Sequence, residues 1–126
     1  MADRADYVLV IDDNEDICSI IEVVLSEDGY DVVCTGDPVA ALRRIAERTP
    51  TVILLDLRMP TMDGEAFARA YRRLPNATAP IILTSALPGA EAHAARIGAA
   101  GCLAKPFDLD DLLAAVQSAP SLRAVS

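Results

Sequence analysis

The stretch "YVLVIDDNED" (residues 7–16) ends five apolar residues in a cluster of acids. Its apolar half is typical of a short buried strand, and Asp12 and Asp13 follow that strand directly, with Glu15 and Asp16 close behind. Neighbouring carboxylates repel one another and resist desolvation, so packing of a core does not explain their position. We therefore expect a bound cation at the end of this strand.

The same kind of apolar run recurs along the chain. The runs are "YVLVI" (7–11), "DVVC" (31–34), "TVILL" (51–55), "PIILT" (80–84) and "GCLA" (101–104). They are continuous rather than alternating and are rich in Val, Ile and Leu, which is typical of parallel strands covered on both faces. Helical patterns separate them, so strand and helix alternate five times. This order predicts an α/β fold with an open, doubly wound sheet and right-handed crossovers.

The segments between the runs carry helix signals. Gly29 closes the first helical segment as a C-terminal cap, and Asp37 before Pro38 is typical of a helix start. The apolar positions of the first segment recur at helical spacing, at Ile17, Ile20, Ile21, Val24 and Leu25. The fourth helix, at about 88–98, is mostly alanine. We expect it to pack more loosely than the other helices.

Length and charge bound the classes of function. A chain of 126 residues fits one domain, which we place at 7–118, with tails at 1–6 and 119–126. The net charge of -8 opposes binding to phosphate backbones and anionic lipid, so we expect no direct nucleic-acid or membrane partner. The charged first residues precede only five apolar ones, too few for a signal peptide or a membrane span. These features predict a soluble, cytoplasmic protein.

The three cysteines are Cys18, Cys34 and Cys102. They form no close-spaced metal-binding pattern, and an odd number in a chain of this size argues against a disulfide framework. We therefore expect free thiols in a reducing cytoplasm.

Polar residues follow four of the predicted strands. In a doubly wound sheet the functional site lies outside the carboxyl ends of the strands, so these side chains are expected to meet. A hard divalent cation with oxygen ligands would relieve the repulsion among the carboxylates, and a lysine opposite them would attract an anion. An aspartate in such a site can act as a nucleophile toward a phosphoryl group. The candidate residues are Asp12, Asp13, Asp56, Thr84, Ser85 and Lys105.

Four motifs occur in order along the chain: "VIDDNED" (10–16), "LLDLRMPTMDG" (54–64), "PIILTSA" (80–86) and "CLAKPF" (102–107). With these motifs the sequence resembles the receiver domains of two-component response regulators, of the chemotaxis-regulator type. The resemblance extends from residue 7 to about residue 118. It implies a flavodoxin-like (βα)5 fold with five parallel strands in the order 2-1-3-4-5.

The resemblance also implies a role for each site residue. Asp56 would accept a phosphoryl group from a sensor histidine kinase or a histidine phosphotransfer protein. Mg²⁺, or Mn²⁺ in its place, would be bound by Asp12, Asp13, Asp56 and the backbone carbonyl of Arg58. Ser85 and Lys105 would contact the phosphoryl group, and the bond from Lys105 to Pro106 would be cis. A downstream protein would bind the face formed by the fourth helix, the fifth strand and the fifth helix.

Other conspicuous residues have simpler interpretations. Cys102 stands where similar proteins usually have an aromatic residue, and we expect it to be a small core residue. His93, the only histidine, is expected on the surface, and "ARAYRR" (68–73) is expected to form a solvated basic face. Met59, Pro60 and Gly64 match the family's loop after the nucleophile, where a turn is needed before the third helix, and we expect them to be structural.

Two other classes of function remain open. Haloacid-dehalogenase-like phosphatases also use an aspartate nucleophile with Mg²⁺, but they normally have a second aspartate two residues later, where this chain has Arg58. An interaction module that works without phosphorylation is the other alternative, although such modules tend to lose acidic-pocket residues that this chain keeps. We interpret the chain as a signalling switch rather than an enzyme. It would be a single-domain regulator, a relay intermediate or the receiver of a longer protein.

Overall fold

The structure is a computed structural model that describes residues 7–58 and 62–125. The expected tail at 1–6 and the loop residues Met59 and Pro60 lie outside the described residues. The elements are β1 (Tyr7–Ile11), α1 (Glu15–Glu27), β2 (Asp31–Thr35), α2 (Pro38–Glu47), β3 (Val52–Asp56), α3 (Gly64–Arg72), β4 (Ile81–Ser85), α4 (Ala90–Ile97), β5 (Gly101–Ala104) and α5 (Leu109–Val125).

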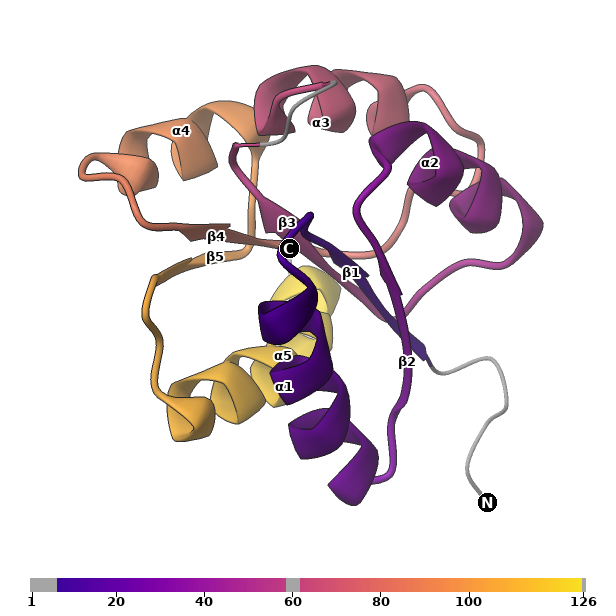
Figure 1. Ribbon diagram of the computed structural model, residues 1–126. Helices are drawn as coiled ribbons and strands as arrows, with labels where there is room; N and C mark the ends of the chain where they lie inside the picture. Colours follow the sequence, from indigo (N-terminus) through magenta and orange to yellow (C-terminus); the bar gives the residue numbers. More distant parts are fainter. Residues whose placement is uncertain (1–6, 59–61, 126) are drawn as a thin grey trace.

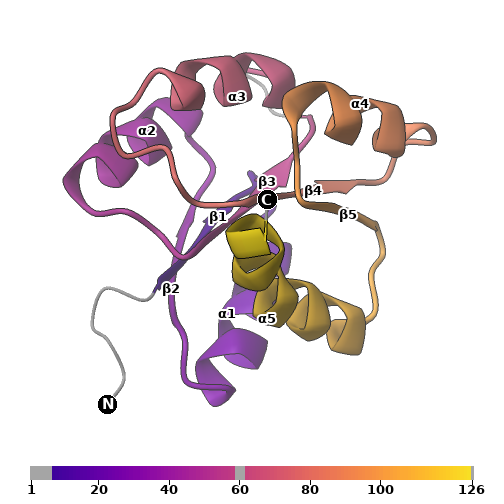
Figure 2. The ribbon, with the colours of Figure 1, turned by 180° about the vertical axis from the view of Figure 1, so that it is seen from behind.

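The five strands form one parallel sheet in the order β2-β1-β3-β4-β5. Helices α2, α3 and α4 cover one face of this sheet, and α1 and α5 cover the other (Figures 1 and 2). The predicted doubly wound fold and strand order are therefore confirmed. All five strands start within one residue of the apolar runs that predicted them.

The core lies in two layers, one on each face of the sheet. Because successive strand residues point to opposite faces, Leu9 and Ile11 pack toward α3, whereas Val8 and Val10 pack toward α1 and α5. All four side chains are at most 1% exposed. Burying a side chain of this size stabilises the fold by about 2 kcal/mol, so the continuous apolar runs are explained by burial on both sides.

Side-chain caps set the starts of the helices that follow β1 and β2. The Asn14 side chain accepts hydrogen bonds from the backbone amides of Asp16 and Ile17, and α1 begins at the next residue. The Asp37 side chain accepts one from the amide of Val39, with Pro38 in the first turn of α2, as predicted. A cap of this kind contributes about 1 kcal/mol. These bonds hold the loops that follow β1 and β2.

The last helix differs from the prediction. A tail was expected from residue 119, but α5 continues to Val125 and Ala119 is fully buried. Leu112, Val116 and Ala119 share one helical spacing and join the same core layer, so the apolar face extends past the expected boundary. Although α5 is the longest helix at 17 residues, no helix in the described part of the chain has the length and apolar character needed to cross a bilayer.

The cysteines also differ from the prediction. Cys18 of α1 and Cys34 of β2 form a disulfide, with their Cα atoms 6.0 Å apart, so the expectation of three free thiols was wrong. Helix α1 packs against β2, and this packing brings together two cysteines whose separation in sequence gave no sign of proximity. Cys102 is a free thiol, half-buried against the core layer under α3 and α4. Burial raises the pKa of the Cys102 thiol.

Reduction of the Cys18–Cys34 disulfide is expected to lower the free energy of unfolding. The two residues are 16 positions apart, and closing a loop of about this length contributes about 3 kcal/mol. Urea unfolding with and without a reductant measures the difference. The Cys102→Ser variant keeps the disulfide and should lose the same stability on reduction. A Cys18→Ser, Cys34→Ser double variant should be insensitive to the reductant, and equal midpoints for the oxidised and reduced wild type would contradict the prediction.

Candidate functional site

The predicted acidic residues meet at the carboxyl edge of the sheet. Asp12 follows β1 directly, and Asp56 is the last residue of β3, the neighbouring strand. One carboxylate oxygen from each of Asp12, Asp13 and Asp56 lies within 4.8 Å of the other two. The parallel pairing of β1 and β3 therefore produces the cluster that the sequence predicted.

The three carboxylates differ in their access to water. Asp12 is 4% exposed and Asp56 is 8% exposed, whereas Asp13 is exposed at the mouth of the site. Burial raises the pKa of the Asp56 carboxyl, and the nearby charge of Asp12 raises it further. The Lys105 ammonium and the backbone amide of Arg58 oppose this shift. Removing a buried like charge, or adding a cation, would therefore favour the ionised form of Asp56.

Lys105 lies between the two buried carboxylates. Its Nζ donates a hydrogen bond of 2.7 Å to Oδ2 of Asp12 and is 3.5 Å from Oδ1 of Asp56. The peptide bond from Lys105 to Pro106 is cis, as the resemblance implied. The Lys105 amide also donates to the Ser85 carbonyl at 2.7 Å, which ties the end of β5 to the end of β4. The lysine thus places a positive charge beside both buried carboxylates.

Backbone amides orient the two buried carboxylates. The amide of Asn14 donates to Oδ1 of Asp12 at 2.9 Å, and the amide of Arg58 donates to Oδ1 of Asp56 at 3.3 Å. Both donors come from the loops that follow β1 and β3. Each aspartate is therefore fixed by its own loop. In the described part of the chain, no side-chain nitrogen or oxygen atom that is itself fully shielded from solvent lacks a hydrogen-bond partner.

The two hydroxyl residues at the end of β4 are already engaged locally. Thr84, which pairs with Asp56 across the sheet, donates to the carbonyl of Leu55 at 3.4 Å. Ser85 is 2% exposed, and its hydroxyl oxygen accepts a bond of 2.9 Å from the amide of Leu87. Ser85 thus lies on the strand next to β3, and its hydroxyl is bonded to its own loop rather than to an acid.

The sequence of the chain matches a known protein family. The family described as "Response regulator receiver domain" matches residues 8–117, nearly the whole chain. The chain belongs to this family. The recognition made from the four sequence motifs is therefore confirmed, and the chain is a receiver domain of two-component response regulators.

Curated relatives of this receiver domain are longer regulators. It is 33% identical over 120 residues to regulatory protein AtoC of Escherichia coli, covering 94% of this chain and 26% of AtoC. It is 35% identical over 113 residues to transcriptional regulatory protein PrrA of Mycobacterium tuberculosis, covering 88% of this chain and 48% of PrrA. The receiver domain thus spans between a quarter and a half of these relatives. Since PrrA is named a transcriptional regulator, the absence of nucleic-acid binding stays a prediction for this domain alone.

Solved structures share the fold. One is the receiver domain of sensor histidine kinase PA1611 from Pseudomonas aeruginosa, with a magnesium ion coordinated in its active-site cleft; the TM-score is 0.82 at 30% identity, covering 92% of this chain and 97% of that one. Another is the chemotaxis protein CheY4 of Vibrio cholerae, with a TM-score of 0.83 at 30% identity and coverage of 90% and 98%. In both cases the match covers nearly the whole of the solved chain.

The donor set of this receiver domain fits a divalent cation. Hard cations such as Mg²⁺ take oxygen ligands, and the site gathers three carboxylates whose repulsion a cation would relieve. With Lys105 included, the group carries a formal charge of -2 when all three acids are ionised. One divalent cation would cancel that charge, and the exposed Asp13 gives it a route from solvent.

Sequence reasoning missed one residue that shapes the site, Gly36. A Cβ atom at Gly36 would come within 3.0 Å of the Asp13 Cα, so any side chain there would displace the acidic loop. The amide of Asp12 also donates to the carbonyl of Thr35 at 3.0 Å, which places the end of β2 against this loop. The available signal was a single glycine two positions after the second apolar run, which is the position directly after β2.

Proposed function

We propose that this receiver domain transfers a phosphoryl group from a phosphohistidine to Asp56 in a Mg²⁺-dependent reaction. The donor would be a sensor histidine kinase or a histidine phosphotransfer protein. The observation that supports this most is the Lys105 ammonium, held between the buried carboxylates of Asp12 and Asp56. Buried ion pairs contribute little net free energy to folding, so the stability of the fold does not explain this arrangement. Binding of an incoming anion by the ammonium group does.

The hydrogen bonds around Asp56 indicate which oxygen reacts. Oδ1 accepts from the Arg58 amide and faces the Lys105 ammonium, whereas Oδ2 accepts no hydrogen bond from any residue that the structure describes. We assign Oδ2 as the nucleophile. It would form a bond to phosphorus while the bond from phosphorus to the histidine nitrogen breaks, and the electron pair of that bond stays on the nitrogen.

The other residues would stabilise charge on the transferred group. Lys105 would move its ammonium from the carboxylates to a phosphoryl oxygen, and the Ser85 hydroxyl would turn from the Leu87 amide to another. Asp12, Asp13, Asp56 and the Arg58 carbonyl would hold Mg²⁺. A bound Mg²⁺ supplies positive charge that offsets the charge developing on the phosphoryl oxygens.

Incubation with Mg²⁺ and acetyl phosphate separates this function from its alternatives. A phosphoacceptor gives one phosphoryl adduct by intact mass, and hydroxylamine removes it because it is an acyl phosphate. Continued consumption of the donor without an adduct would instead indicate a phosphatase. No adduct and no consumption would indicate an interaction module that works without phosphorylation.

Arg58 is expected to influence the lifetime of the phosphoryl group. It is exposed, and its amide contacts Asp56, so its side chain can extend over the entrance to the site. Arg58→Ala should change the hydrolysis rate of the adduct by about threefold or more, because the guanidinium hinders or orients attacking water. The decay of the adduct by mass spectrometry gives the rate. Arg43→Ala, at an exposed arginine on α2, is the control; identical decay in all three proteins would remove Arg58 from the mechanism.

The signal would leave through the segment at about 86–107. Phosphorylation acts by stabilising one existing arrangement over another. Helix α4 has eight residues, no side-chain cap at its start, and only Ala90, Ala94 and Ile97 buried. It is therefore the helix that moves at the lowest cost in lost packing, and we propose that α4, β5 and α5 form the face for the downstream partner.

Amide hydrogen exchange tests this route. A phosphate mimic, beryllofluoride with Mg²⁺, should change protection most within 86–107, and Ser85→Ala should reduce that change by removing the hydroxyl that follows the phosphoryl group. Since Cys102 lacks a ring, Cys102→Tyr tests whether an aromatic side chain strengthens the response. Changes confined to the loops around Asp13 and Asp56 would show that this face is not the output.

A further inference from the structure

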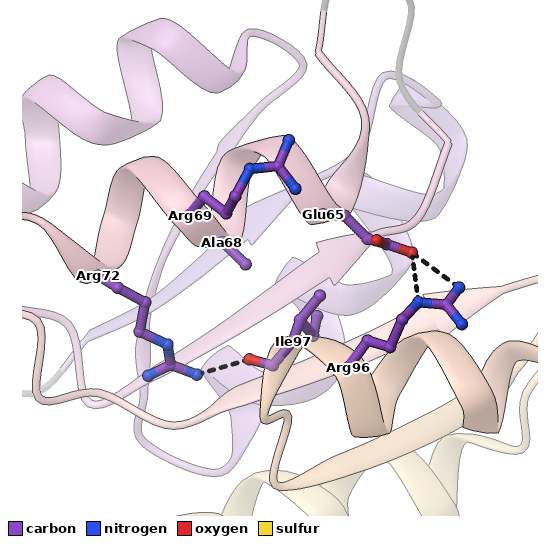
Figure 3. Close-up of a pocket in the computed structure, with 6 residues that line it drawn as sticks. All are labelled: Glu65, Ala68, Arg69, Arg72, Arg96 and Ile97. Atoms are coloured by element: carbon purple, nitrogen blue, oxygen red, sulfur yellow. Dashed lines mark hydrogen bonds and ion pairs between the residues drawn. The ribbon is translucent and has the colours of Figure 1, made fainter.

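A second hollow lies between α3 and α4, apart from the acidic site. Its volume is about 350 Å³, which is the size of a small-molecule site. None of the residues that surround it belongs to the proposed phosphorylation machinery. Figure 3 shows the lining residues, Glu65, Ala68, Arg69, Arg72, Arg96 and Ile97. We call this hollow the α3–α4 pocket.

The α3–α4 pocket is basic in an acidic protein. Three of the eleven basic side chains of the chain, those of Arg69, Arg72 and Arg96, line it, although the net charge of the whole chain is -8. The one acid among its described lining residues, Glu65, is already paired, because Arg96 and His93 both bond its carboxylate. These bonds lower the pKa of the Glu65 carboxyl, first through Arg96 and then through His93. The pocket therefore attracts anions.

Two of the three guanidinium groups are held in place by the protein. Nη2 of Arg72 donates to the carbonyls of Ile97 and Gly98, at 2.8 and 3.2 Å, where α4 ends. Arg96 donates to Oε2 of Glu65 from Nε at 3.3 Å and from Nη2 at 3.0 Å, as Figure 3 shows. Each arginine keeps other N–H groups free for a ligand. Fixing these side chains in advance reduces the entropy lost on binding.

The third guanidinium group is free to close on a ligand. Arg69 is exposed, and no hydrogen bond or ion pair joins it to any residue that the structure describes. It stands on α3 between Glu65 and Arg72 (Figure 3). Ala68 and Ile97, which also line the pocket, are 3% and 9% exposed, and their side chains are apolar. The solvated basic face expected for "ARAYRR" is thus, in part, one wall of a pocket that α4 completes.

We propose that the α3–α4 pocket binds a small polyanion that carries at least two phosphate or carboxylate groups. Planar guanidinium groups bind both kinds of group through paired N–H donors. Two groups are specified because the arginines come from two helices across a volume larger than one phosphate fills. The pocket shares no residue with the phosphorylation site, so this proposal stands independently of the function proposed above.

Calorimetric titration with pyrophosphate, and separately with citrate, tests the proposal in metal-free buffer. We expect saturable binding to one site, with the tighter ligand showing whether phosphate or carboxylate is preferred. Arg69→Gln should weaken binding at least about fivefold, the effect of losing one charged hydrogen bond. Arg43→Gln removes the same charge from the exposed surface of α2 and should change affinity less than about twofold. Arg69 is chosen because it holds no other part of the fold.

Amide chemical shifts locate the bound anion. Binding in the α3–α4 pocket should shift the signals of 65–72 and 96–98 in particular. Shifts centred on Ser85 and Lys105 would place the anion at the phosphorylation site and overturn the proposal. If Arg69→Gln and Arg43→Gln weakened anion binding equally, the cause would be the net charge of the protein rather than the pocket. That result would also overturn the proposal. So would the absence of saturable binding by both probes.

Discussion

Replacement of Asp56 with asparagine is expected to abolish the phosphoryl adduct completely while it stabilises the metal-free protein at neutral pH. The amide is a poor nucleophile, so the first effect follows from the proposed chemistry. The second follows from the environment, since burial and the neighbouring Asp12 raise the pKa of the Asp56 carboxyl and thus disfavour its charge. A loss of function and a gain in stability from one substitution would be hard to explain by misfolding.

The gain in stability should depend on pH. A folded-state pKa above the unfolded value means that the ionised carboxylate destabilises the fold at pH values above both. Asp56→Asn should therefore raise the free energy of unfolding by about 1 kcal/mol at pH 7, a usual size for single substitutions. The gain should disappear below about pH 4, the unfolded pKa of aspartate, where both side chains are neutral.

Urea unfolding across this pH range, without metal, measures the effect. Asp31→Asn, at an exposed aspartate on β2, is the matched control and should change neither the adduct nor the stability. A gain that is the same at pH 3 and pH 7 would contradict the proposed electrostatic cause. An adduct of undiminished yield in Asp56→Asn would contradict the assignment of the phosphoacceptor.

Asp13→Asn is expected to weaken Mg²⁺ binding by about 100-fold or more. Asp13 is the exposed member of the three-carboxylate cluster. Its side chain makes no hydrogen bond or ion pair with any residue that the structure describes. Its full negative charge is therefore available to the metal. Replacing a residue that only orients a metal ligand lowers metal affinity by about 10- to 100-fold, and the loss of a direct ligand should lower it further. Calorimetric titration with Mg²⁺, and with Mn²⁺ for comparison, measures the affinity.

Asp16→Asn separates a ligand effect from a charge effect. Asp16 is an exposed acid in the first turn of α1, three residues from Asp13, and it is outside the cluster. Its replacement should leave Mg²⁺ affinity nearly unchanged. An unchanged Mg²⁺ affinity in Asp13→Asn would show that Asp13 is not a metal ligand. Equal losses of affinity in both variants would show that Asp13 acts only through its negative charge.

The fold could be predicted because its determinants are local. A run such as "YVLVI" is short, apolar on both faces and followed by a helix signal, so it predicts a parallel strand covered on both faces. The acidic cluster was predictable for a related reason. The carboxyl ends of neighbouring parallel strands meet at one edge, so residues that follow β1 and β3 must come together.

The features that were missed depend on packing between distant elements. The disulfide requires the orientation of α1 over β2, and the α3–α4 pocket requires Arg96 of one helix to meet Arg69 and Arg72 of another. Ala119 carries too weak an apolar signal to show that α5 continues beyond it. No pattern within a single segment contains this information.

Peptide mapping of the phosphorylated protein tests most directly the central claim that Asp56 is a Mg²⁺-dependent phosphoacceptor. The protein is incubated with acetyl phosphate, with Mg²⁺ or after its removal by chelation, and the phosphoryl group is then located by tandem mass spectrometry. We predict a single modification on Asp56 that requires the divalent cation. Equal yields without the cation, or a phosphoryl group on another residue such as His93, would contradict the claim.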